Sequence, residues 1–124
     1  MVPSAHHPAV FFTHSGTVPE DAAPASVGGT TIRLSLVNSP ERGEPGYQEA
    51  KDFASTVCPV GSNAEFVEDS WQLTDKYGRS LGLVYCNDMM LNELLLTNGH
   101  AEISTYYCDR SEFGSEGWAR AYGC

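Results

Sequence analysis

Residues 32–41 combine a short strand with a sharp turn and read Ile32-Arg33-Leu34-Ser35-Leu36-Val37-Asn38-Ser39-Pro40-Glu41. Apolar side chains alternate with Arg33 and Ser35, and this period of two predicts a half-buried strand. Residues 38–46 are rich in Asn, Ser, Pro and Gly, the residues that favour turns. The stretch therefore predicts a strand that carries an arginine and ends in a loop that carries a glutamate.

The sequence after this strand alternates between helical and strand-like spacing. Apolar residues recur at helical spacing from Tyr47 to Val57, and Cys58-Pro59 ends that helix. Beyond it we expect a strand over 64–68, a turn over 74–79, a strand over 80–86, a helix capped by Asp88 and ending at Asn98, a strand over 100–105, and a short helix around Trp118 and Tyr122. Short strands with a helix between them predict an α+β chain, a five-stranded Greek-key barrel of the OB-fold type with about three helices.

The N-terminal side of the strand is less regular. Residues 1–29 hold four of the seven prolines, and at most Ala9 to Thr13 has strand character. We therefore divide the chain into a poorly ordered or divergent segment, residues 1–29, and one OB-fold domain, residues 30–124, whose first strands are divergent or incomplete. A length of 124 residues fits a single domain.

The charge balance restricts the partners of the chain. Seven basic and sixteen acidic side chains give a formal net charge of −9. Such a chain repels phosphate overall, so only a local positive cleft could bind a polyanion. Tyr106 and Tyr107 could stack a base there, or could pack within or beside the core. No stretch approaches the roughly 20 apolar residues that cross a bilayer, so we expect no membrane partner, and we expect a monomer.

The four cysteines, Cys58, Cys86, Cys108 and Cys124, include no Cys-x-x-Cys pair, which argues against structural zinc. An even number in a small acidic chain favours two disulfides and an oxidising compartment over four thiols. Of three possible pairings we favour Cys58 with Cys86 and Cys108 with Cys124. We therefore expect a secreted or extracytoplasmic protein, although residues 1–12 lack the basic start and long apolar run of a signal peptide.

Three blocks, in order, resemble the staphylococcal-nuclease-like (thermonuclease) family. Residues 32–41 resemble the family's pattern of an arginine on an apolar strand followed by Asp-Thr-Pro-Glu. Residues 74–79, Thr-Asp-Lys-Tyr-Gly-Arg, resemble the family's second signature. Residues 91–101 resemble its next helix, which carries an Asn-Glu pair and ends in Gly-x-Ala. Three co-linear blocks are far more specific than one short motif. The resemblance implies an OB barrel with helices and a calcium-assisted enzyme that hydrolyses phosphodiester bonds of DNA and RNA.

The resemblance also implies a role for each matched side chain. Arg33 and Arg79 would bind the reacting phosphate, because the planar guanidinium stays charged and contacts two oxygens together. Glu41 would activate or orient the attacking water. Lys76 and Tyr77 would contact neighbouring phosphate groups. Each residue alone is more often an ordinary surface side chain, and it is their joint occurrence in order that favours the functional interpretation.

The expected calcium ligands are where the sequence departs from the family. Its Asp-Gly-Asp-Thr motif, expected before Arg33, is absent, and its second metal aspartate is replaced by Asn38 beside Ser39. Asn38 and the Ser39 carbonyl can still bind Ca²⁺, but the lost charges predict weaker binding. Two functions follow: a calcium-assisted nuclease for DNA, RNA or both, which we favour, and a catalytically weakened module that binds nucleic acid or protein.

Overall fold

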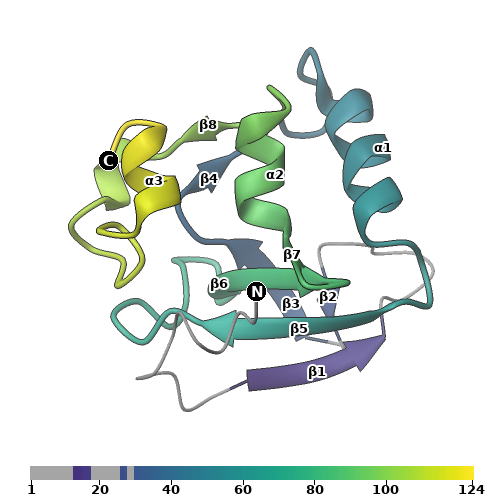
Figure 1. Cartoon of the computed structure of the whole chain (residues 1–124), viewed down its shortest axis with the longest axis horizontal. Coiled ribbons are helices and arrows are strands. Elements are labelled where there is room, and N and C mark those ends of the chain that lie inside the picture. The colour runs from purple at the N-terminus through teal and green to yellow at the C-terminus, as the bar shows by residue number, and fades with distance from the viewer. Residues whose placement is uncertain (1–12, 18–25, 28–29) are drawn as a thin grey trace.

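The computed structural model describes residues 13–17, 26–27 and 30–124 of the chain (Figure 1). Along these residues the elements are β1 (Thr13–Thr17), β2 (Ser26–Val27), β3 (Thr30–Leu34), β4 (Val37–Asn38), α1 (Tyr47–Val57), β5 (Asn63–Glu68), β6 (Ser80–Cys86), β7 (Met89–Met90), α2 (Leu91–Thr97), β8 (Glu102–Ile103), the 3₁₀ helix η2 (Thr105–Tyr107) and α3 (Gly117–Ala121). Figure 1 shows α1 and α2 on one side of strands β1, β3, β5 and β6, with α3 and the C-terminus beyond α2. The chain is therefore α+β, as the sequence predicts.

The larger sheet has the strand order β1-β5-β6-β3-β2, with β7 added to β6, and β4 pairs with β8 in a separate two-stranded sheet. The β3–β6 pair is parallel, whereas the other ladders are antiparallel. The end strands β1 and β2 contact each other but form no ladder, so the described sheet curls without closing. The OB-like fold is confirmed, and among the described residues the sheet is open rather than a closed barrel, because β1 and β2 form no ladder with each other.

The main core lies between the helices and the sheet. Buried residues of α1 and α2 pack with Phe66 of β5 and Val84 of β6. A disulfide between Cys58 and Cys86, with a Cα–Cα distance of 5.6 Å, joins the end of α1 to the end of β6. The second disulfide joins Cys108 to Cys124 across 5.4 Å, so both favoured pairings are present.

A buried side chain, Asn92 of α2, fixes the end of β3. Its Oδ1 accepts the N–H of Val84 at 3.1 Å, and its Nδ2 donates to the carbonyls of Ser35 at 3.0 Å and Gly82 at 3.2 Å. Leu36, which follows Ser35, is buried and has a φ of 67°, a backbone conformation that residues other than glycine rarely adopt. Asn92 thus helps to hold the turn from which the chain leaves β3 toward Glu41.

Several expected elements differ from the structure. The strand expected over residues 100–105 is only β8, Glu102–Ile103, because the 3₁₀ helix η2 begins at Thr105. The strand expected to include Leu36 ends at Leu34, because Leu36 has a positive φ.

The prediction that Asp88 caps α2 is wrong, because Asn87 and Asp88 both have positive φ (53° and 63°) in the turn between β6 and β7, as a type I′ hairpin requires. The strand expected over Ala9–Thr13 lies, except for Thr13, outside the described residues. None of the helices in the described part of the chain has the length and apolar composition of a membrane span.

Candidate active site

All the residues singled out by the sequence line one cleft, which has a volume of about 900 Å³. They are Arg33, Asn38, Ser39, Glu41, Lys76, Tyr77 and Arg79. These residues come from the β3–β4 segment, the loop after β4, and the loop between β5 and β6. The fold therefore brings together segments more than thirty residues apart in the sequence.

The cleft collects most of the positive charge of an acidic chain. Six of the seven basic residues line it: Arg33, Arg42, Lys51, Lys76, Arg79 and Arg110. The carboxylates that line it are those of Glu41 and Asp75. This is the local positive cleft that a polyanion needs on a chain with a net charge of −9.

Sequence reasoning did not assign Arg42, Lys51 or Arg110 to the site, because none lies in a motif. They reach the cleft from the loop before α1, from α1 itself and from the segment after η2. The signal that could have found them is the scarcity of basic residues in so acidic a chain. A cleft that binds nucleic acid needs several cations, so a chain with only seven basic residues must place a large part of them there.

The turn before β6 is organised around the carboxylate of Asp75. Its Oδ1 accepts the backbone N–H groups of Tyr77 and Arg79, each at 2.9 Å, and its Oδ2 accepts Nε–H of Arg79 at 2.7 Å. Burial acts to raise the pKa of Asp75, but hydrogen bonds from Arg79 and Tyr77 outweigh it and lower the pKa below its usual value. The Tyr77 ring is 72% exposed, with Lys76 Nζ 5.2 Å and Arg79 Cζ 5.5 Å from its centroid.

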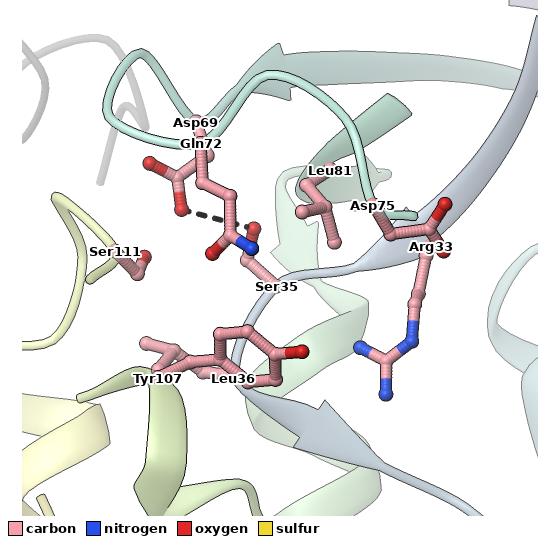
Figure 2. A pocket seen from close by; sticks show the side chains of 9 residues that line it. All are labelled: Arg33, Ser35, Leu36, Asp69, Gln72, Asp75, Leu81, Tyr107 and Ser111. Atoms are coloured by element: carbon pink, nitrogen blue, oxygen red, sulfur yellow. Dashed lines mark hydrogen bonds between the residues drawn. The ribbon is translucent and has the colours of Figure 1, made fainter. Parts of the chain in front are cut away.

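Arg33 lies on β3 and lines both the large cleft and the small cavity drawn in Figure 2. Its Nη1 makes one long contact, 3.4 Å, to the carbonyl of Leu34. No carboxylate among the described residues forms an ion pair with Arg33. Among the described residues, the other N–H groups of this guanidinium thus have no acceptor.

A small cavity of about 10 Å³ adjoins the cleft beside Arg33, and the buried side chain of Asp69 lines it (Figure 2). Asp69 accepts hydrogen bonds from Ser35 Oγ at 3.3 Å and from the N–H groups of Trp71 at 3.2 Å and Glu112 at 3.1 Å. Burial raises the pKa of Asp69, and hydrogen bonds from the Ser111 side chain and from the Glu112 and Trp71 N–H groups oppose the rise only partly. Asp69 thus connects the end of β3 to the C-terminal segment.

Glu41 is exposed in the loop after β4. Its backbone N–H donates to Glu44 Oε1 at 2.7 Å, and the Glu44 N–H donates to the Glu41 carbonyl at 2.8 Å. The Glu41 carboxylate has no partner among the described residues and lines the cleft. Its oxygens are therefore available to bind a water molecule.

The calcium ligands expected from the sequence form an incomplete set. Asn38 and Ser39 line the cleft with Glu41, and Glu102 of β8 is the cross-strand partner of Asn38. No cluster of three His, Cys, Asp or Glu side chains suited to a metal occurs in the described ranges. Calcium takes six to eight oxygen ligands, and its affinity follows their charge. The oxygens of Asn38, Ser39 and Glu41 are of the kind that calcium binds, but they fit only a weak and largely hydrated site.

The fold and the cleft define an OB-like protein with an arginine-rich cleft. The family described as "Staphylococcal nuclease homologue" matches residues 31–117, so the chain belongs to the staphylococcal nuclease homologue family. The sequence is 32% identical over 89 residues to the probable staphylococcal-like nuclease CAN3 of Oryza sativa subsp. japonica. This match covers 72% of this chain and 22% of that protein. The sequence is also 32% identical over 89 residues to the probable staphylococcal-like nuclease CAN2 of the same plant, a match that covers 72% of this chain and 23% of that protein.

An uncharacterized protein of Bacillus anthracis is also similar, with 32% identity over 80 residues that cover 60% of this chain and 37% of that protein. The chain thus spans less than a quarter of the length of the two rice relatives. These matches show the family to which the chain belongs.

Proposed function

We propose that the protein is a nuclease that hydrolyses phosphodiester bonds of DNA, RNA or both in the arginine-rich cleft. The observation that carries the proposal is that Arg33, Arg79 and Glu41 line one cleft together with four further cations. Phosphodiester hydrolysis needs positive charge on the phosphate oxygens and a group that orients or deprotonates water. The cleft holds both kinds of group.

In this proposal Arg33 and Arg79 bind the reacting phosphate. Arg33 has no ion pair in the described structure, and Arg79 gives its Nε–H to Asp75, which leaves its two terminal nitrogens for a ligand. Guanidinium donors oriented before the reaction stabilise the negative charge that develops on the phosphate oxygens, at no reorganisation cost. Lys76 and Tyr77, in the adjoining turn, contact neighbouring phosphate groups of the same strand.

Glu41 takes the role of the group that binds and activates water. Its carboxylate is exposed to the cleft and is held on a loop that the Glu41–Glu44 hydrogen bonds organise. A carboxylate in this position contributes about 10²–10⁴-fold to the rate.

The proposal includes a weakly bound calcium ion near Asn38, Ser39 and Glu41. Calcium, when bound, would neutralise part of the charge that develops on the phosphate. Ligand sets with few carboxylates bind calcium with dissociation constants of about 10⁻⁴–10⁻³ M, which suits an extracellular compartment. The two disulfides support the same compartment, and we propose a secreted or extracytoplasmic monomer.

The second candidate function is a binding module with weakened catalysis. It is favoured by the small number of carboxylates available for calcium in the described residues. Such a module would use the same cations to bind nucleic acid but would leave the phosphodiester intact.

Cleavage of a fluorescent single-stranded DNA, with calcium and with a chelator, tests the nuclease. We expect millimolar calcium to support cleavage, Glu41→Gln to lower the rate at least about 10²-fold, and Arg33→Ala to lower it about 10²–10³-fold. Glu49→Gln on α1 and Arg120→Ala on α3 make the same charge changes away from the cleft and should have no such effect. DNA binding without cleavage by the folded protein would favour the binding module instead.

A further inference from the structure

Arg110 lies over the ring of Tyr106 at the part of the cleft formed by residues 105–110. Its Cζ is 3.9 Å from the ring centroid, and its Nη1 donates to the Tyr106 carbonyl at 2.7 Å. The ring of Tyr107 meets that of Tyr106 edge-on, with the centroids 4.8 Å apart. Cys108, between these residues, is joined to Cys124 by a disulfide. The guanidinium is therefore held in one orientation by its own neighbours.

The remaining donors of Arg110 have nothing to bind within the described structure. Nη1 contacts the Tyr106 carbonyl and, at 3.4 Å, the exposed carboxylate of Asp109. Nε–H and both N–H groups of Nη2 have no acceptor among the described residues. Nε and Nη2 lie on one edge of the guanidinium plane, and this edge matches two oxygens of a phosphate. The ring and the carbonyl thus orient Arg110 while leaving its bidentate edge free.

The position of Arg110 distinguishes it from the arginines of the proposed reaction. Arg33 and Arg79 come from β3 and from the turn before β6, whereas Arg110 comes from the C-terminal segment, and all three line the same cleft. A positive groove whose walls also carry tyrosines is typical of proteins that follow a strand of nucleic acid. Four of the six tyrosines line this cleft: Tyr47, Tyr77, Tyr106 and Tyr107.

We propose that Arg110 binds a phosphate of the substrate strand next to the reacting phosphate, with Tyr106 as the residue that positions its guanidinium. The substrate is then an oligonucleotide strand that engages the cleft through at least two phosphates, rather than a single phosphodiester. This inference rests on the proposed nuclease function of the same cleft.

Binding in the presence of a chelator tests the subsite without catalysis. The probe is a fluorescent single-stranded DNA of about eight nucleotides, a length within the range bound by single OB folds, with anisotropy measured at several salt concentrations. Arg110→Gln should weaken binding about three- to ten-fold and reduce the salt dependence by about one phosphate contact, a slope change of roughly 0.7. Arg120→Gln, which removes the one basic residue outside the cleft, should change neither value.

The positioning role of Tyr106 is tested by two substitutions. Tyr106→Phe keeps both the ring and the carbonyl and should bind like the wild type. Tyr106→Ala removes the ring and should lose affinity while keeping the salt dependence, because the charge of Arg110 remains. Equal loss in both variants, or none in either, would show that the ring does not position Arg110. Melting temperatures confirm that each variant is folded.

Further ligands separate the possible outcomes. A dinucleotide with a single phosphodiester should bind the wild type and Arg110→Gln equally. If Arg110→Gln weakened the binding of inorganic phosphate alone as much as that of the oligonucleotide, the subsite would take free phosphate and the strand assignment would be wrong. If the wild type bound and cleaved DNA while Arg110→Gln matched Arg120→Gln, only the subsite would be overturned. Absence of DNA binding and cleavage in the wild type would overturn the proposed function and the subsite with it.

Discussion

The Nε atom of Arg79 lies 2.7 Å from Oδ2 of Asp75, and the other oxygen of that carboxylate accepts two backbone N–H groups of the same turn. The side chain of Asp75 is 10% exposed and that of Arg79 is 39% exposed. One largely buried carboxylate therefore fixes both the shape of the turn and the direction of an arginine whose terminal nitrogens remain free for the cleft. In the proposed reaction Asp75 is therefore a positioning residue that acts through Arg79.

Asp75→Asn is expected to impair DNA cleavage more than folding. The amide keeps the size of the side chain but loses the charge that pairs with Arg79, so kcat/KM should fall about ten-fold or more, and the free energy of unfolding should fall by about 1 kcal/mol. Cleavage assays and denaturant titrations measure the two effects. Asp52→Asn on the exposed face of α1 makes the same change outside the cleft and should leave both unchanged. Unaltered cleavage by Asp75→Asn would contradict the role given to Asp75.

Asp69 and Asp75 should contribute to stability with opposite dependence on pH. The pKa of Asp75 is lowered from 3.8 in the folded state, so its contribution is present above that pH and is lost as the pH falls below it. The pKa of Asp69 is raised from 3.8, so its contribution is greatest below that pH and is lost as the pH rises through the folded-state value.

Unfolding free energies of the wild type, Asp69→Asn and Asp75→Asn, measured from about pH 3 to pH 7, check both signs. The difference between wild type and Asp75→Asn should shrink on acidification, and the difference between wild type and Asp69→Asn should grow. Two differences that change in the same direction would show that one of the two environments is wrongly assigned.

The residues that the sequence singles out all line one cleft, whereas the shape of the sheet could not be predicted. The strand over residues 32–36 and the turn over 74–79 have local signals, and the fold places Arg33 and Arg79 in one cleft. The start of α2 could not be predicted, because the positive φ of Asn87 and Asp88 creates a hairpin where helical spacing suggested a cap. Arg110 lies in none of the three sequence blocks that resemble the family, so its local contact with Tyr106, four residues earlier, could not be predicted from a motif.

Asn92→Ala should destabilise the protein by about 3 kcal/mol. The substitution removes the side-chain partner of the Val84 N–H and of the Ser35 and Gly82 carbonyls, of which the Gly82 carbonyl keeps the Ser35 N–H, and each buried group left unsatisfied costs about 1–3 kcal/mol before relaxation. Denaturant unfolding measures the loss. Asn98→Ala, at the exposed end of α2, should change stability by less than about 1 kcal/mol. A loss from Asn92→Ala no larger than that of Asn98→Ala would show that Asn92 does not hold the β3–β6 junction.

Removal of the disulfide between Cys108 and Cys124 should weaken both stability and oligonucleotide binding. The bridge closes a loop between residues 16 apart, and a loop of this size corresponds to about 3 kcal/mol of unfolding free energy. The loop also carries Arg110, so freeing it should reduce the affinity for the oligonucleotide in chelator. The double variant Cys108→Ser with Cys124→Ser is compared with wild type by denaturant unfolding and by anisotropy. Unchanged affinity in the folded double variant would separate the disulfide from the orientation of Arg110.

Restoring a carboxylate at position 38 should strengthen calcium binding. Asn38 lines the cleft beside Ser39 and Glu41, so Asn38→Asp adds one negative charge to a ligand set with a single carboxylate at the cleft. Because calcium affinity follows ligand charge, we expect about a ten-fold lower dissociation constant, measured by isothermal titration calorimetry. Asn63→Asp, on the exposed start of β5, adds the same charge elsewhere and should leave the affinity unchanged. If both variants bound calcium like the wild type, calcium would not be held near residue 38, and the cleft would have to act on phosphodiesters without calcium at that position.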